Sequence, residues 1–457
     1  METRYNVMKK VREINSAEEK TLLAYTCVHG CAQNEADMEN IRGMLMEMGY
    51  GFTDTPETAD VIVVNTCAVR EGAEFKIYGN VGAFKKIKEK NPNLVIVLCG
   101  CMMQQESVAR KIKHSYPYVD IVFGTFNIAD FPLMLYKKLT GTKRVFEMLT
   151  EGKIVEGMPT VRENKFSASV SVMSGCNNFC SYCIVPYTRG RERSRQFDAI
   201  INEIKGLAKE GYVEITLIGQ NVNSYGKDLA DKPTFAKLLR AVNDIEGIKR
   251  IRFVTSHPKD LSDELIEAMA QCKNVCKQLH LPFQAGNNKI LKLMNRKYTK
   301  EQYLALVEKI KAAIPDISLT TDVIVGFPGE TTEDFEDTMD VLHKVKYDGV
   351  YSFIYSRRGG TPAAKMEDVI SEEEKHKNLE RLLEEQKEIG YENNLKYMDN
   401  VYEVLVEGKS KSNDNMLSGR TEDNKIIHFE GDESLIGTFV NIKITKIKTF
   451  YMVGERI

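Results

Sequence analysis

Three cysteines within eight residues constrain this chain more than any other feature. Cys176, Cys180 and Cys183 form a Cys-x3-Cys-x2-Cys run after an apolar segment that is typical of a strand. Thiolate sulfur is a soft ligand that suits zinc or an iron-sulfur cluster. A structural zinc site normally has four protein ligands, and this loop holds no fourth Cys or His. A 4Fe-4S cluster held by three cysteines keeps one iron open for chemistry, so we expect a catalytic cluster here, with zinc as the alternative.

The composition is that of an ordinary folded protein. The 457 residues, 42% hydrophobic and 28% charged, are enough for roughly two to four domains with sizeable cores. The polar start and the short apolar runs predict neither a signal peptide nor a membrane span, so we expect a cytoplasmic protein. Ten cysteines in that compartment favour metal or redox chemistry over disulfides. With a net charge of −2, any RNA binding must come from local patches.

The N-terminal part predicts a second metal site. Residues 20–140 alternate short apolar runs with amphipathic stretches, which indicates a doubly wound parallel sheet covered by helices on both faces. Cys31, Cys67 and Cys101 each follow one of these runs. Loops after parallel strands meet at one edge of a sheet, so we expect the three thiols to converge there. Gly100 would let the backbone pass close to a bulky cluster.

The central part predicts a barrel of the α/β class. Residues 141–165 are polar with little periodicity, as in an interdomain linker. Residues 166–392 carry six strand-like runs separated by helical stretches, which predicts a partial (βα)6 barrel with the cysteine run at the top of its first strand. An incompletely closed barrel leaves a lateral opening that a large substrate could use.

Two regions are candidates for RNA contact. Residues 393–457 change to short alternating runs, which predicts a small closed antiparallel β-barrel, an architecture often used for oligonucleotides. This barrel would offer Arg420 and His428 to RNA and Phe429 for base stacking. The second candidate follows the cysteine run and consists of Arg189, Arg191, Arg193 and Arg195. The alternative for both regions is structural: a barrel that braces the core, and a salt-bridged turn.

The cysteine run, with Tyr182 inside it, resembles the motif of radical S-adenosylmethionine (SAM) enzymes. In these enzymes the open iron chelates SAM, and reduction cleaves SAM to methionine and a 5'-deoxyadenosyl radical. Polar residues after the later strands suit the amino, carboxylate and ribose groups of this ligand, although each alone also suits a loop-structuring role. The expected SAM-binding residues are Tyr182, Gln220, Asn221, Ser256, His257, Gln284, Gly326 and Glu330.

Further segments extend this resemblance over nearly the whole chain. GCAQN, NTCAVRE and CGCMMQ precede the cysteine run, and GQNVNSYG, TSHP, LHLPFQAG, LMNRKYT and DVIVGFPGET follow it. Together they resemble the methylthiotransferase family of radical SAM enzymes. The resemblance implies an N-terminal methylthiotransferase domain, a radical SAM core and a C-terminal TRAM domain.

The resemblance also implies cofactors, a reaction and partners. It implies that a radical SAM 4Fe-4S cluster is bound by Cys176, Cys180 and Cys183. It implies that an auxiliary 4Fe-4S cluster is bound by Cys31, Cys67 and Cys101, and that all six cysteines are catalytic. The implied reaction is methylthiolation of carbon 2 of N6-isopentenyladenosine at position 37 of tRNA, with one SAM as methyl donor, a second as radical source, and the sulfur on the auxiliary cluster. The implied partners are the tRNA anticodon stem-loop, an electron donor such as flavodoxin or ferredoxin, and a sulfur or cluster carrier.

Two other functions stay open on the sequence. The first is a methylthiotransferase that acts on threonylcarbamoyladenosine in tRNA or on a ribosomal protein aspartate. The second is a non-catalytic iron-sulfur protein that carries electrons while it binds RNA. Two three-cysteine sites argue against the second, because electron carriers normally close all cluster irons with protein ligands.

Overall fold

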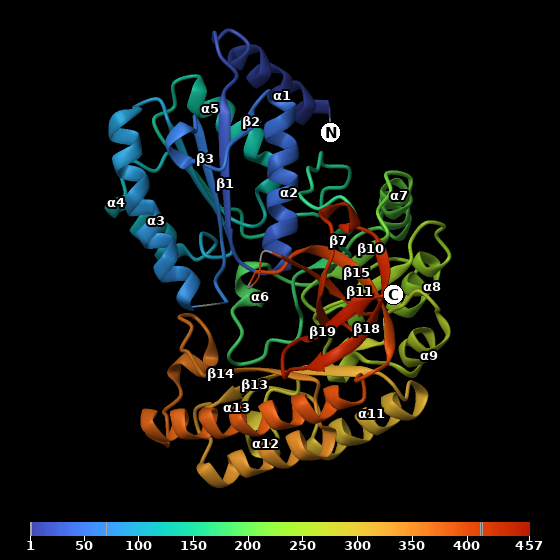
Figure 1. The fold of residues 1–457 in the computed structure, drawn as a ribbon. Helices are drawn as coiled ribbons and strands as arrows, with labels where there is room; N and C mark the ends of the chain where they lie inside the picture. Colours follow the sequence, from blue (N-terminus) through green and yellow to red (C-terminus); the bar gives the residue numbers. More distant parts are fainter. Residues whose placement is uncertain (1, 70, 412, 414) are drawn as a thin grey trace.

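A sheet domain, a partial barrel and a small closed barrel follow one another along the chain. They are seen in a computed structural model that describes residues 2–69, 71–411, 413 and 415–457. In Figure 1 the sheet domain, in blue and teal, lies above the partial barrel, and the closed barrel, in red, lies over one side of it. Within the described residues, no helix is both long and apolar enough to cross a membrane.

The N-terminal domain is built on a six-stranded parallel sheet in the order β2-β1-β3-β4-β5-β6. Its strands are β1 (Leu23–His29), β2 (Gly51–Phe52), β3 (Val61–Thr66), β4 (Val95–Gly100), β5 (Ile121–Phe123) and β6 (Val145–Glu147). One face is covered by α1 (Glu2–Asn15), α2 (Ala32–Glu47) and α5 (Phe131–Leu139). The other face is covered by α3 (Glu71–Lys90) and α4 (Glu106–Ser115). Because both faces are covered, every residue of β3 and β4 is buried.

Two elements of this domain differ from the sequence-based expectation. Helix α1 precedes the predicted domain, and its Met8 and Val11 are buried in the core that α2 and α5 share. Strand β6 pairs in parallel with β5, although its residues fall inside the predicted linker 141–165. The connection to the next domain is therefore shorter than predicted at its N-terminal end.

The central domain has six parallel strands in two groups, β11-β10-β7 and β12-β13-β14. A parallel bridge between Ile251 and Val275 joins the groups into one curved, partial barrel. The strands are β7 (Ser167–Ser171), β10 (Glu214–Ile218), β11 (Arg250–Phe253), β12 (Gln278–His280), β13 (Ser318–Val325) and β14 (Gly349–Ile354). The helices outside it are α7 (Phe197–Lys209), α8 (Phe235–Asn243), α9 (Asp263–Gln271), α11 (Lys300–Ala313), α12 (Thr332–Val345) and α13 (Glu372–Leu395). The predicted six-stranded partial barrel is confirmed.

Shorter elements complete this domain around the cysteine run. Strands β8 (Met173–Ser174) and β9 (Arg193–Ser194) pair antiparallel on either side of the run. The short helices are α6 (Val185–Thr188) and α10 (Asn288–Leu293). The cysteine run therefore lies in a loop whose two ends are held together.

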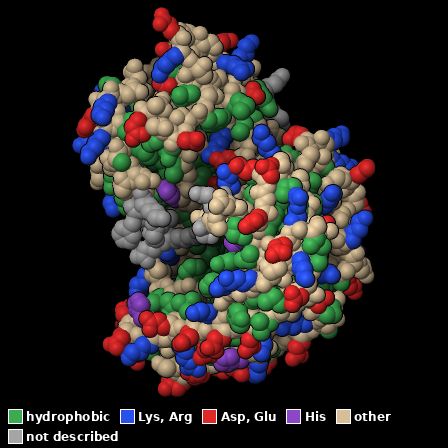
Figure 2. All heavy atoms as spheres, viewed as in Figure 1, with side chains coloured by type: hydrophobic (Ala, Val, Ile, Leu, Met, Phe, Trp, Pro, Cys, Tyr) green, Lys and Arg blue, Asp and Glu red, His purple; other side chains and the backbone are tan. Residues whose placement is uncertain are grey.

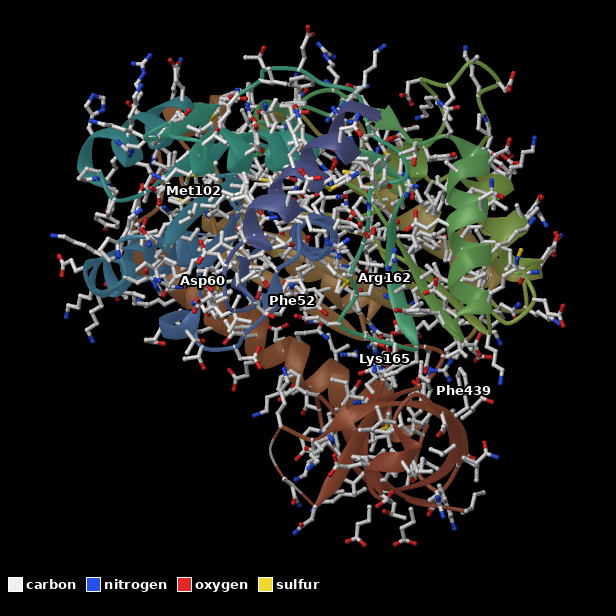
Figure 3. All side chains as sticks on the ribbon, turned by 90° about the horizontal axis from the view of Figure 1, so that it is seen from above. Phe52, Asp60, Met102, Arg162, Lys165 and Phe439 are labelled. Carbon is white, nitrogen blue, oxygen red and sulfur yellow. The ribbon has the colours of Figure 1, made fainter. Side chains whose placement is uncertain are left out.

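The C-terminal domain is a closed barrel in the order β15-β16-β17-β19-β18. Its strands are β15 (Val401–Lys409), β16 (Met416–Arg420), β17 (Ile426–Glu430), β18 (Phe439–Ile447) and β19 (Met452–Arg456). Seen from above, this barrel projects from the rest of the molecule, with Phe439 and Lys165 near the junction (Figure 3). The predicted small antiparallel barrel is confirmed.

Buried arginines attach the C-terminal barrel to the amino-terminal end of the partial barrel. Arg250 donates to the carbonyl oxygens of Arg420 and Glu403, at 2.6 and 2.9 Å. Arg252 pairs with Glu214 at 2.9 Å and donates to the carbonyl oxygens of residues 421 and 422. Because Ile251 between the two arginines packs outward on the core, both arginines point into the barrel and fill its floor.

We predict that Arg252→Met destabilises the protein by about 3–5 kcal/mol, since the Glu214 carboxylate would stay buried without its guanidinium partner. Thermal unfolding followed by circular dichroism measures the loss. A double variant, Arg252→Met with Glu214→Leu, should recover part of it because no buried charge is left behind. Equal destabilisation of the single and double variants would contradict this account.

Candidate functional site

The cysteines of the N-terminal domain come together at the carboxyl edge of its sheet. Cys31 begins helix α2 after β1, Cys67 follows β3, and Cys101 follows β4. The three strands are neighbours in the sheet, so their loops are adjacent. The pKa of Cys101 is raised to about 11, mainly by burial and in part by the nearby Cys31 and Cys67, although Arg189 acts to lower it. The structure thus places the three thiols within electrostatic reach of one another, as predicted.

Two asparagines, which the sequence analysis did not single out, fix these loops. The Asn34 amide donates to Asn65 Oδ1 at 2.8 Å, and the Asn65 amide donates to the Asn34 carbonyl at 3.0 Å. Asn34 Oδ1 in turn accepts from the backbone N–H of Cys31. Gly100 is required beside Asn65, because its φ is +97° and a Cβ there would collide with the Asn65 side chain. The sequence offered one signal for this role: Asn34 lies close to Cys31 along the chain, and Asn65 lies close to Cys67.

The cysteine run of the central domain lies where β7 and its extension end. The loop is anchored on the segment after α10: Ser181 Oγ donates to the Leu293 carbonyl at 2.7 Å, and Asn295 donates to the Phe179 carbonyl at 2.8 Å. Burial raises the pKa of Cys176 to about 11 and that of Cys183 to about 12, with Cys180 adding to both. All ten cysteines are free thiols.

Each cysteine set has one buried arginine that donates to a thiol. Arg189 Nε donates to Cys101 Sγ at 3.1 Å, and its Nη2 pairs with Asp37 at 2.8 Å. Arg296 Nη1 donates to Cys180 Sγ at 3.5 Å. Burial acts to lower the pKa of Arg189, but the Asp37 carboxylate and Cys101 raise it above its ordinary value. The surrounding Tyr298, Tyr182 and Cys180 likewise raise the pKa of Arg296 against the effect of burial, so both guanidinium groups stay charged. Arg296 lies in the motif LMNRKYT, which is the one sequence signal for its role. The contact of Arg189 with Cys101 could not be predicted from the sequence.

The two sets of three thiols suit iron-sulfur clusters, because thiolate sulfur is a soft ligand. In the part of the chain that the structure describes, no group of three or more His, Cys, Asp or Glu side chains is arranged to hold one ion. A tetrahedral zinc site needs sulfurs that all lie about 2.3 Å from one metal. Each set supplies three thiols, which leaves one iron of a 4Fe-4S cluster without a protein ligand, whereas a structural zinc ion normally takes four protein ligands. Which cysteine holds which cluster stays a prediction.

The residues expected to bind SAM gather at the carboxyl ends of β10 to β13. Three of them carry a buried polar atom that has no hydrogen-bond partner among the described residues: Asn221 Oδ1, Ser256 Oγ and Glu330 Oε1. Such atoms are costly unless a ligand or water satisfies them, so they fit a polar ligand at this position. Burial raises the pKa of Glu330 to about 7.

The other expected SAM residues have partners within the protein. Gln220 Oε1 accepts from the backbone N–H of Gly175 at 2.6 Å, and His257 Nδ1 accepts from that of Lys259 at 3.2 Å. Burial and nearby cations lower the pKa of His257 to about 2, so its ring is neutral. Gln284 and Gly326 have positive φ angles of 70° and 68°, which shape their loops. Tyr182 packs edge-on against Phe327.

Comparison with known proteins matches all three domains. Residues 23–124 match an uncharacterized protein family, UPF0004, residues 170–342 match the Radical SAM superfamily, and residues 396–457 match the TRAM domain. A tRNA-2-methylthio-N(6)-dimethylallyladenosine synthase from Acetivibrio thermocellus is 54% identical over 451 residues, which cover 98% of this chain and 94% of that relative. A protein of the same name from Thermoanaerobacter sp. strain X514 is 53% identical, over 99% of this chain and 96% of its own.

The chain belongs to this synthase family. Membership confirms the resemblance expected from the motifs, as well as the class of enzyme. Among solved structures, the radical SAM methyltransferase TsrM from Kitasatospora setae has a TM-score of 0.54 at 14% identity, over 75% of each chain. The cobalamin-dependent radical SAM enzyme OxsB has a TM-score of 0.52 at 13% identity, over 81% of this chain and 58% of that one. At these identities the likeness shows the fold alone.

For a member of this family, the predicted RNA contacts near the cysteine run need correction. Arg189 is only 3% exposed and is held by Asp37 and Cys101, so it is not available to RNA. Arg193 and Arg195 are half-buried and hold the interdomain connection. Arg191 alone is exposed, with its guanidinium 4.7 Å from the centre of the Phe179 ring.

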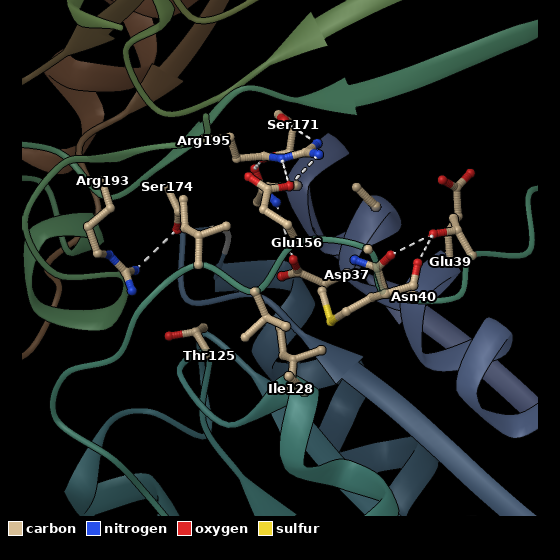
Figure 4. A pocket seen from close by; sticks show the side chains of 18 of the residues that line it. Asp37, Glu39, Asn40, Thr125, Ile128, Glu156, Ser171, Ser174, Arg193 and Arg195 are labelled. Atoms are coloured by element: carbon tan, nitrogen blue, oxygen red, sulfur yellow. Dashed lines mark hydrogen bonds and ion pairs between the residues drawn. The ribbon is translucent and has the colours of Figure 1, made fainter. Parts of the chain in front are cut away.

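Arg193 and Arg195, which were expected to contact RNA, line a cavity of about 460 Å³ (Figure 4). It lies between α2, the interdomain connection and the end of the cysteine-run loop. Arg195 pairs with Glu156 at 2.6 Å and with Glu203 at 2.7 Å, and Arg193 donates to the carbonyl of Gly152. These contacts tie the connection to the central domain. The alternative of a salt-bridged turn holds for Arg195, whereas Arg193 donates to backbone carbonyls and to Ser174.

The C-terminal barrel also corrects one expected contact. Phe429 is fully buried in the barrel core with Ile427 and Leu417, so its expected stacking on RNA is wrong. Arg420 is half-buried beside Glu407. The His428 ring lies edge-on to Tyr451, with 4.9 Å between ring centres. Of the three expected residues, only these two reach the surface.

We predict that the thiols of the metal-free protein differ in reactivity. Cys31 is exposed, whereas Cys101 is 4% exposed and its raised pKa leaves little thiolate at pH 8. Iodoacetamide should therefore alkylate Cys31 at least about tenfold faster than Cys101, because only the accessible thiolate reacts. Mass spectrometry of peptides from a time course measures both rates. Equal rates would contradict the burial of the loop after β4.

Proposed function

We propose that this chain inserts a methylthio group at carbon 2 of N6-isopentenyladenosine at position 37 of tRNA. The observation that carries the proposal is the pair of three-cysteine sets, which two different parallel sheets direct toward each other. Arg189 and Asp37 join them on one side. On the other side, Arg358, which follows β14, donates to the carbonyl of Val69, two residues after Cys67, at 2.8 Å. The family name of the relatives supports the substrate.

The substrate explains the need for two metal centres. Carbon 2 of adenine carries an unactivated C–H bond, and no side-chain base removes its proton at neutral pH. When bound, the clusters and SAM supply an electron, a 5'-deoxyadenosyl radical and a transferable methylated sulfur. The protein would hold each cluster through three thiolates, buries four of these six thiols, and sets the separation of the two sites.

We assign the radical SAM cluster to the cysteine run of the central domain and the auxiliary cluster to Cys31, Cys67 and Cys101. The unpaired atoms of Asn221, Ser256 and Glu330 support SAM binding beside the first of these. A carboxylate and an amide oxygen suit the SAM ammonium group, and a serine hydroxyl suits the ribose. His257, being neutral and already bonded, positions its loop.

The partners follow from the same assignment. The TRAM domain and the tRNA-modifying relatives support tRNA as the substrate. Reduction of the radical SAM cluster needs an electron donor, for which we propose flavodoxin or ferredoxin, and each turnover consumes a sulfur that a sulfur or cluster carrier would replace. Because the proposed substrate is tRNA, we propose that the enzyme acts in the cytoplasm. We propose a radical SAM core that begins at residue 166 and a TRAM domain that ends at residue 457, with the limit predicted at 392/393 moved to the end of α13 at Leu395.

Mass spectrometry of tRNA nucleosides tests both the reaction and the division of labour. The protein is reconstituted anaerobically with iron and sulfide and then given SAM, dithionite and isopentenylated tRNA. We expect it to replace the hydrogen at carbon 2 of the isopentenyladenosine with a methylthio group. Cys180→Ala should abolish deoxyadenosine formation and methylthiolation together. Cys67→Ala should keep SAM cleavage and lose methylthiolation.

A matched control comes from Cys272, which is buried but belongs to neither set. Cys272→Ala should retain both activities. Loss of SAM cleavage in a folded Cys67→Ala protein would contradict the assignment, as would methylthiolation by Cys180→Ala. Deoxyadenosine without any methylthio product from the wild type would point to another substrate.

We further predict that the two buried arginines tune the two clusters separately. A cation beside a thiolate stabilises the reduced, more negative cluster, so its removal lowers the reduction potential. At an effective dielectric constant of about 20, one charge at this range is worth on the order of 100 mV. Arg189→Met should lower the potential of the auxiliary cluster, and Arg296→Met that of the radical SAM cluster, in a redox titration followed by electron paramagnetic resonance.

The lysine variants serve as controls for this prediction. Arg189→Lys and Arg296→Lys keep the charge, so each should shift its potential less than the methionine variant does. Iron and sulfide content, measured on the same samples, separates loss of tuning from loss of the cluster. A shift of the same size at both clusters in either methionine variant would contradict separate tuning.

A further inference from the structure

Strand β14 carries exposed aromatic rings on the inner face of the partial barrel. Tyr351 and Phe353 are 57% and 56% exposed. Val350 packs outward against the helices, so the alternation of the strand directs Tyr351 and Phe353 to the opposite, inner face. In Figure 2, hydrophobic side chains gather in the hollow over β14. Large apolar side chains exposed at the outer strand of a sheet indicate a binding surface.

The aromatic row leads toward the cysteines. Tyr355 continues the face of Tyr351 and Phe353, because its backbone N–H still pairs with β13. The three side chains span roughly 13 Å at about 3.3 Å per residue. The Tyr355 ring lies 5.3 Å from that of Phe327, which lies 6.4 Å from that of Tyr182, inside the cysteine run.

The same strand joins the two other parts of the molecule. Just beyond its carboxyl end, Arg358 contacts the loop of Cys67 through the Val69 carbonyl. Just before its amino end, Asp348 pairs with Lys425 of the TRAM barrel at 2.6 Å. Strand β14 therefore runs from a contact with the TRAM domain to a contact with the loop of Cys67.

Polar groups accompany the row. His280 on β12 lies edge-on to Tyr351, with 5.8 Å between ring centres. Its ring nitrogens contact Thr320 Oγ1 at 3.0 Å and Asp322 at 3.4 Å, both on β13. Aromatic faces with polar groups beside them are what proteins use to stack unpaired RNA bases and read their edges.

We propose that Tyr351 and Phe353 form a stacking platform for the unpaired bases of the anticodon loop, which directs the isopentenyladenine along the face that the buried Tyr355 continues, toward the gap between the cysteine sets. This inference rests on the proposed function. The five-carbon isopentenyl group is apolar, and the exposed rings offer it an apolar surface. The contact of β14 with the TRAM barrel favours RNA over a second protein chain as the occupant.

Binding of a fluorescent, isopentenylated anticodon stem-loop RNA to the reconstituted full chain tests the platform. Tyr351→Ala and Phe353→Ala should each weaken the affinity about tenfold, as expected for one lost stacking contact. Phe353→Leu keeps apolar area without an aromatic face and should fall between Phe353→Ala and wild type. Tyr391→Ala, which removes an exposed ring from α13, is the matched control and should bind as wild type.

Two further readouts on the same samples keep the outcomes distinct. Dithionite-driven SAM cleavage without RNA should stay within about twofold of wild type in every variant, since none of them touches a cysteine or SAM residue. Unchanged RNA affinity in both alanine variants, alongside normal methylthiolation by wild type, would overturn the platform alone. Loss of self-association in the variants, with RNA affinity unchanged, would assign the rings to a second copy and also overturn it. Absence of methylthiolation by wild type would overturn the proposed function and this inference together.

Discussion

The buried contact of Arg189 with Asp37 and Cys101 sets the relation between the two halves of the site. A guanidinium removed from water needs negative groups around it, and here the N-terminal sheet domain supplies them. Because Arg189 follows Cys183 by six residues, the ion pair places the cysteine run relative to Cys101. Burial of such a pair is costly, so its contribution is to position the two domains rather than to add stability.

Most of the fold could be predicted because each strand has a recognisable pattern of apolar residues within its own short segment. The continuous apolar runs of β3 and β4 require cover on both faces, and the short alternating runs near the C-terminus require a closed barrel. Helix α1 was missed because its sequence is mostly polar and, among its residues whose burial is described, Met8 and Val11 are the hydrophobic side chains that are buried. Strand β6 was missed because three residues have no periodicity, and only pairing with β5 makes them a strand.

The residues of the site also fall into two groups: some could be predicted from short segments of sequence, and others depend on contacts between distant parts of the chain. The cysteines could be found because their spacing and their positions after strands are properties of short segments. The burial of Arg189 could not, since its partner Asp37 lies 152 residues away in another domain. The incorrect prediction for Phe429 could have been avoided. Alternate residues of a strand share a face, so Phe429 lies on the same buried face of β17 as Ile427, and His428 lies on the other face.

The arginine-filled floor of the partial barrel determines how small molecules are exchanged. Arg250, Arg252 and Glu214 occupy the amino-terminal end, and the backbone of the TRAM barrel closes it from below. SAM and its cleavage products therefore enter and leave on the side that faces the sheet domain and the exposed rings of β14. In the proposed mode of RNA binding, the second SAM molecule enters through the opening that the RNA covers. The proposal therefore makes departure or partial lifting of the RNA a step of the catalytic cycle.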